Sequence, residues 1–113
     1  KEVIKMFFIN KDIKLQTIDG NTKRKVLAHG QHMMGAEVHF EKPTNSVDLH
    51  RHVHEQLTYI LKGSFKFTVG EETRIVKAGD TVFMPSNVLH GCIVLEENSI
   101  LFDTFTPQRE DFL

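Results

Sequence analysis

The sequence predicts an all-β fold, because short extended segments alternate with turn signals and no window of ten or more residues carries a convincing helical apolar stripe. Residues Phe65–Val69 alternate apolar and polar side chains with a period of two, as a half-buried strand does. Gly70-Glu71 follows as a two-residue hairpin turn, in which the glycine can adopt a positive φ. Eight or more short strands with turns this closely spaced are typical of a sandwich or a barrel.

Breaks in the apolar pattern indicate where each predicted strand begins and ends. Gly30-Gln31 separates the first two segments, and the loop Pro43-Thr44-Asn45 precedes the third. The predicted strands are Lys23–His29, His32–Phe40, Ser46–His52, Leu57–Leu61, Phe65–Val69, Thr73–Lys77, Thr81–Met84, Val88–Leu95 and Ser99–Phe105. In a small all-β chain, closure into a jelly roll also protects sheet edges that would otherwise be exposed.

Length and composition exclude several classes of protein. The 113 residues predict a single domain over 1–113, with N-terminal strands or an arm over 1–22. A net charge of −1 argues against a duplex nucleic-acid partner. No apolar run approaches the roughly 18 residues of a membrane span, so we expect no membrane partner. The N-terminal residues lack a signal-peptide pattern and the single cysteine, Cys92, cannot form an internal disulfide, which favours a cytoplasmic protein.

Seven histidines stand out in the composition, and three of them alternate along one short segment that leads to Gln56. A straight strand would place Gln56 about 20 Å from His50. Ligands of one metal ion lie about 2 Å from it, so their donor atoms must lie close together. A turn between His52 and Gln56 removes the conflict and leaves His54 near the rim, where its role as a ligand stays open. The histidines interpreted as strand residues are His29, His32 and His39.

A fourth donor must come from a distant segment, and His90 is the best candidate because an apolar strand and a turn with Pro85 precede it. The pattern His-x-His-x-x-x-Gln, with Gly63 seven residues further on, resembles the first motif of the cupin family, whose last ligand is usually Glu. Gly79, Pro85 and His90 resemble its second motif, with Asn87 where Gly is common. The resemblance implies a double-stranded β-helix, the cupin or jelly-roll barrel, from about residue 26 onward. It also implies a metal site formed by His50, His52, Gln56 and His90.

Such a ligand set is neutral, which has consequences for the chemistry. Three imidazoles and one amide leave the charge of a divalent ion uncancelled, so the site should attract an anionic substrate. The set does not choose the ion, and the divalent transition metals Zn, Ni, Co, Fe and Mn are all compatible with it. With one coordination position open, polarisation of a substrate oxygen or activation of a bound water becomes available.

The C-terminal segment holds a second group of candidate residues. Asp103 and Phe105 share a face of the last predicted strand, and Arg109 follows in a turn after Pro107. An arginine can hold a carboxylate, an aromatic ring can stack on a sugar, and an aspartate can move a proton. The alternative is that Asp103 and Arg109 form a surface ion pair and that Phe105 belongs to the core. The pattern Asp-x-Phe-x-Pro-x-Arg-x-Asp resembles small cupins of the pectin-degradation group, which implies catalytic or substrate-binding roles for Asp103, Phe105 and Arg109.

The resemblance implies a metal-dependent enzyme whose partner is a small anionic sugar. Members of the group open the ring of 4,5-unsaturated uronates and release linear keto-sugar acids. Two other interpretations stay open: an Fe- or Ni-dependent dioxygenase, and a non-enzymatic module that binds or senses a sugar. The resemblance also implies a homodimer, to which the apolar stretch Met6–Ile9 could contribute, although the same stretch could instead cover the chain's own core.

Overall fold

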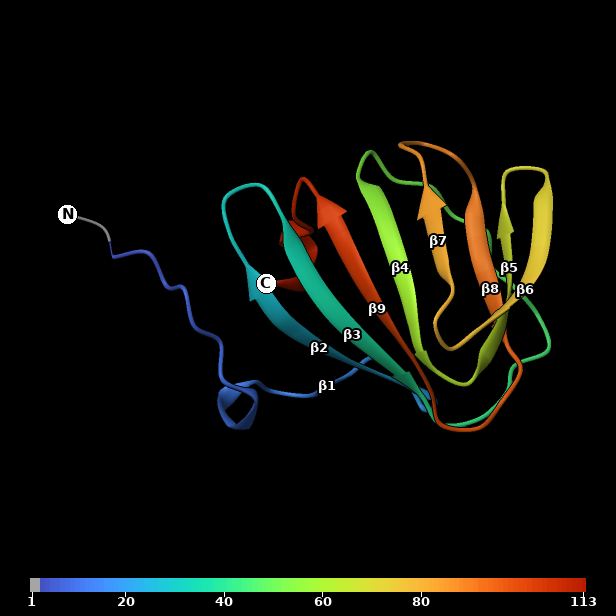
Figure 1. The fold of residues 1–113 in the computed structure, drawn as a ribbon, viewed down its shortest axis with the longest axis horizontal. Helices are drawn as coiled ribbons and strands as arrows, with labels where there is room; N and C mark the ends of the chain where they lie inside the picture. Colours follow the sequence, from blue (N-terminus) through green and yellow to red (C-terminus); the bar gives the residue numbers. More distant parts are fainter. Residues whose placement is uncertain (1–2) are drawn as a thin grey trace.

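The computed structural model describes residues 3–113 and confirms the all-β prediction. The strands are β1 (Gln16–Thr17), β2 (Thr22–His29), β3 (Met34–Phe40), β4 (Glu55–Lys62), β5 (Ser64–Val69), β6 (Glu72–Lys77), β7 (Thr81–Met84), β8 (His90–Val94) and β9 (Ser99–Thr106). Two short 3-10 helices are η1 (Asn10–Asp12) and η2 (Glu110–Phe112). Strands β1-β2-β3-β9-β4-β7 form one antiparallel sheet and β6-β5-β8 form another, as Figure 1 shows.

Strand β4 shows how alternation builds the interior. Its buried side chains are Gln56, Thr58 and Ile60, whereas Leu57 and Tyr59 point outward and stay partly exposed. The outward residues include the large side chains of Leu57, Tyr59 and Leu61, and an aromatic residue such as Tyr59 suits a pleated surface. The two inward polar residues therefore lie at one end of a strand whose other end is apolar, and this division separates the site from the core.

The apolar core lies between the two sheets. Ile60 and Leu101 come from the six-stranded sheet, and Phe65, Phe67 and Val94 come from the three-stranded sheet. The edge of the Phe40 ring meets the Phe65 ring with centroids 5.6 Å apart, in the geometry that aromatic pairs prefer. This packing holds the two sheets together, so the cavity beside it has rigid walls.

The connection between β4 and β5 depends on Gly63. Its φ is +81°, and an added Cβ would overlap the side chain of Ser99. Only glycine meets both demands at low cost, because it has no Cβ and adopts positive φ readily. The predicted hairpin at Gly70-Glu71 is also present: it joins β5 to β6, and Gly70 has φ +59°.

The predicted strand Ser46–His52 is wrong. Within it only His50 pairs, in an isolated bridge to His90 whose two N–O distances are 3.0 and 2.9 Å. The segment instead crosses close to β8 at Gly91, where an added Cβ would lie 2.6 Å from the side chain of Val47 and 2.9 Å from the carbonyl oxygen of Asp48. Apart from the bridge at His50, this segment forms no strand pairing with β8 among the described residues. His32, also interpreted as a strand residue, lies in the turn between β2 and β3.

Residues 3–9 lead away from the two sheets as an extended segment (Figure 1). Their apolar side chains are largely exposed, with Met6 at 77% and Phe7 at 79%. Within a single chain this part of the predicted arm therefore covers no core, and residues 1–2 of that arm lie outside the described residues. No helix among the described residues is long and apolar enough to cross a membrane.

Candidate metal centre

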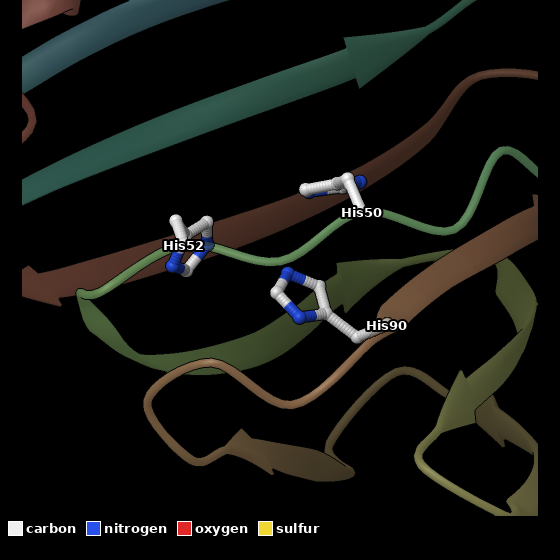
Figure 2. A group of neighbouring side chains, drawn as sticks. All are labelled: His50, His52 and His90. Atoms are coloured by element: carbon white, nitrogen blue, oxygen red, sulfur yellow. The ribbon is translucent and has the colours of Figure 1, made fainter.

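Three histidines from two segments gather at one end of the cavity between the sheets. His50 and His52 lie on the segment that leads into β4, and His90 begins β8, as Figure 2 shows. One ring nitrogen of each lies within 4.8 Å of the others. The bridge between His50 and His90 brings these two residues together, and their ring centroids are 4.5 Å apart. The bend at Val53-His54 then returns the chain so that β4 starts beside them.

Backbone carbonyl groups determine which nitrogen of each ring is free. The Nδ1 atom of His90 lies 3.0 Å from the Val88 carbonyl oxygen, and that of His52 lies 2.8 Å from the carbonyl oxygen of His54. A carbonyl oxygen only accepts, so each Nδ1–H must donate and each neutral ring keeps a lone pair on Nε2. His50 has the same arrangement with the Asp48 carbonyl oxygen, at the longer distance of 3.4 Å.

The free nitrogen atoms fit a metal ion. The Nε2 atom of His90 is buried and has no hydrogen-bond partner among the described residues. A buried hydrogen-bond acceptor without a partner costs free energy. A cation that binds the lone pair of this nitrogen would remove that cost. At protein metal sites, a histidine commonly binds the ion through one ring nitrogen and donates the N–H of the other nitrogen to an acceptor such as a carbonyl oxygen.

Gln56 adds an oxygen to this group. Its amide Nε2 donates to the Thr58 hydroxyl and to Oδ1 of Asp103, each at 3.0 Å, which leaves Oε1 to face His52. That Oε1 lies 3.0 Å from Nε2 of His52. With Nδ1 of His52 already donating, both atoms of this contact carry lone pairs. They repel each other unless a second proton or a cation lies between them, so the contact also fits a metal ion.

Asp103 lies directly behind Gln56 and is 8% exposed. Burial raises its pKa to about 6, although hydrogen bonds from the Thr58 hydroxyl and the Gln56 amide work in the opposite direction. Both hydrogen bonds end on Oδ1, whereas Oδ2 has no hydrogen-bond partner among residues 3–113. The sequence-based reasoning missed Thr58, although the alternation of β4 places it two residues from Gln56 on the same face.

Arg109 does not pair with Asp103, contrary to the surface ion pair considered as an alternative. Its guanidinium group instead binds Asp111, at 3.0 Å from Nε and 2.9 Å from Nη2. Phe105 is 2% exposed, with its ring centroid 6.0 Å from that of His52, so this core residue also touches the histidine group. The same guanidinium group lies 5.5 Å from the Phe105 ring centroid.

Several of these groups line one cavity of about 480 Å³. Its wall includes His50, Gln56, His90, Asp103, Phe105 and Arg109. A cavity of this volume accommodates a monosaccharide-sized ligand. It combines a group of neutral donors with a buried carboxyl group, an aromatic ring and a guanidinium group, which is a chemistry suited to an anionic sugar.

His54 lies beside the three-histidine group and is not part of it. Its Nε2 atom donates to the Gln108 carbonyl oxygen at 3.2 Å, so its ring supports the segment that carries Arg109. Burial, more than the nearby guanidinium group, lowers the pKa of His54. The other histidines take no part in the site, and His39 pairs with Glu37 at 2.6 Å.

Comparisons with known proteins agree with this geometry. The model of the cupin domain family matches residues 36–102, more than half of the chain. The chain is 34% identical to the pectin degradation protein KdgF of Dickeya dadantii, over 97% of this chain and all of that protein. The structure of KdgF from Halomonas sp. superimposes with a TM-score of 0.89 at 32% identity, covering 97% of this chain and all of that one. An RmlC-like cupin from Shewanella frigidimarina gives 0.88 at 32% identity, with 97% of each chain covered.

Proposed function

Since the chain belongs to the cupin domain family, we propose that it is a metal-dependent enzyme that opens the ring of 4,5-unsaturated uronates and releases linear keto-sugar acids. The observation that carries this proposal is a group of three imidazoles beside an amide oxygen, next to a cavity that a buried carboxyl group and a guanidinium group also line. The similarity to a pectin degradation protein over nearly the whole chain supports the substrate class.

We propose that His50, His52, Gln56 and His90 hold a divalent transition metal. When bound there, the ion supplies an uncancelled positive charge that polarises a substrate oxygen. Every one of these donors is neutral, so the ligands themselves would leave the charge of the ion uncancelled and available to the carboxylate of a uronate.

Three other side chains of the site are suited to binding the substrate and to transferring a proton. Arg109 is suited to bind the carboxylate, and the ring of Phe105 is suited to pack against the sugar. Asp103 is the residue in this group that can move a proton, because its Oδ2 has no hydrogen-bond partner among the described residues. The hemiacetal hydroxyl loses a proton, the ring C–O bond breaks, and a proton adds to the enol carbon. The sequence of steps is an isomerisation in which no atom is gained or lost.

The direct test is an ultraviolet assay on the metal-loaded protein. Ring opening and tautomerisation remove the double bond conjugated to the carboxylate, so we expect the absorbance of unsaturated galacturonate to fall faster than it does spontaneously. A folded, metal-loaded sample with no acceleration would contradict the proposal. Oxygen consumption in a parallel electrode measurement would point to a dioxygenase, and tight binding without turnover would point to a sugar-binding module.

We also propose that the protein is a homodimer that uses the N-terminal apolar segment. Met6 and Phe7 are exposed in the single chain, and a second copy would remove their apolar surface from water. Analytical ultracentrifugation should therefore give a dimer for the full chain and a monomer for Met6→Ser/Phe7→Ser. Ile75→Ser, at another exposed apolar position (67%), serves as the control and should stay dimeric. A monomeric unmodified chain would contradict this proposal.

A further inference from the structure

The carboxylate of Asp111 makes a two-point contact with the guanidinium group of Arg109. Asp111 lies in η2, two residues after Arg109, and its carboxylate binds the guanidinium group through both oxygen atoms. The contacts join Oδ1 to Nε and Oδ2 to Nη2. The carboxylate therefore occupies one edge of a planar group whose five N–H donors have a fixed arrangement.

The adjacent edge of the guanidinium group, formed by Nη1 and Nη2, is left for another acceptor. Both hydrogens of Nη1 and the second hydrogen of Nη2 have no partner among the residues that the structure describes. These donors form the second edge on which an arginine can bind a carboxylate through two parallel hydrogen bonds. One aspartate can thus hold Arg109 in place without using the edge that a substrate would need.

The locations of the two side chains favour this division. The side chain of Asp111 is 62% exposed, whereas that of Arg109 is 20% exposed. Arg109 lines the cavity together with His50 and His90, and Asp111 is not among the residues that line it. The aspartate therefore binds the guanidinium group from the solvent side and does not fill the place of a ligand carboxylate.

Aromatic packing keeps this turn in position. The Phe112 ring lies edge-on to Phe105, at 5.5 Å between centroids and 89° between ring planes. The guanidinium groups of Arg24 and Arg109 lie 3.6 and 4.5 Å from the centroid of the same Phe112 ring. Arginine stacked on an aromatic ring is attracted to the face of the ring, so Phe112 links η2 to β2 and to the cavity wall.

We propose that Asp111 is a positioning residue: it fixes the guanidinium group of Arg109 so that its free edge receives the carboxylate of a uronate. This inference rests on the proposed function, since it names the residue that prepares Arg109 for that substrate. Without Asp111 the arginine side chain would gain rotational freedom, and binding a carboxylate would then cost more conformational entropy.

The test compares Asp111→Asn with Glu110→Gln, which removes one negative charge from the same short helix. Glu110 is exposed, and its side chain has no hydrogen bond among the described residues. Calorimetry with D-galacturonate measures binding without turnover, and D-galactose serves as the ligand without a carboxylate. We expect Asp111→Asn to weaken galacturonate binding and to raise KM about tenfold, with kcat changed less than about threefold. Glu110→Gln should match the unmodified protein, and Asp111→Glu should recover part of the affinity.

The results separate this inference from the proposed function. If galacturonate binds to the unmodified protein but no unsaturated uronate is consumed, the proposed function fails and the binding comparison still tests Asp111. Asp111→Asn binding galacturonate as tightly as the unmodified protein, or more tightly, would overturn the inference, because the aspartate would then be idle or a competitor. An unmodified protein that binds no galacturonate would overturn it as well.

Discussion

Replacing Asp103 with asparagine is expected to lower kcat about 10²- to 10⁴-fold, the usual contribution of a positioned proton-transfer group. The substitution keeps the shape of the side chain and an oxygen that can accept from the Thr58 hydroxyl and the Gln56 amide. It removes the negative charge and the ability to take up and release a proton at the second carboxylate oxygen. Steady-state rates of absorbance loss measure the effect, and elemental analysis should show an unchanged metal content.

Asp12→Asn is the matched control for this change. Asp12 is an exposed aspartate in η1, outside the cavity wall, and the same loss of one negative charge there should leave kcat within about twofold of the unmodified value. A ligand-binding module without catalysis would instead retain its sugar affinity in Asp103→Asn. Full turnover by Asp103→Asn would show that this carboxyl group moves no proton in the reaction.

The fold was predictable wherever a strand carries its own pattern. The alternation of Phe65–Val69 and the glycine turn after it correctly predict the β5–β6 hairpin, because both signals are local. The segment 46–52 looked equally extended, yet its conformation depends on the close approach to Gly91, which lies about forty residues further along the chain. Pairing between distant segments is not encoded in a short window, so the wrong strand could not have been recognised from its own residues.

The hydrogen bonds that connect Gln56 and Thr58 to Asp103 could not be predicted from the sequence for a related reason. The alternation of β4 places Thr58 and Gln56 on one face, but their hydrogen bonds to Asp103 depend on the register between β4 and β9, in which Thr58 lies opposite Asp103. A shift of one residue in this register would turn the carboxylate to the opposite face. The contact of Asp111 with Arg109 spans only two residues, yet the pattern alone did not show which edge of the guanidinium group is left free.

Replacing His90 with alanine is expected to weaken metal binding by at least about 100-fold, which is the upper range for losing a group that only supports a ligand. His90 is 2% exposed, and its unpartnered Nε2 is the clearest evidence among the three rings for a bound cation. The substitution removes that nitrogen while the bridge between the backbones at His50 and His90 can remain. Titration of the metal-free protein with Zn²⁺ or Ni²⁺, followed by calorimetry, measures the loss.

His54→Ala separates a metal ligand from a neighbouring histidine of the same segment. His54 directs its Nε2–H to the Gln108 carbonyl oxygen, so its removal should leave the metal affinity within about threefold of the unmodified value. Equal losses in the two variants would show that the histidines act together through packing, and an unchanged affinity in His90→Ala would exclude His90 as a ligand. Because both side chains contact His52, at centroid distances of 5.4 Å for His54 and 4.8 Å for His90, proximity alone cannot produce the expected difference. The expected difference in metal affinity must instead come from the free Nε2 lone pair of His90, since Nε2 of His54 carries a hydrogen and donates to Gln108.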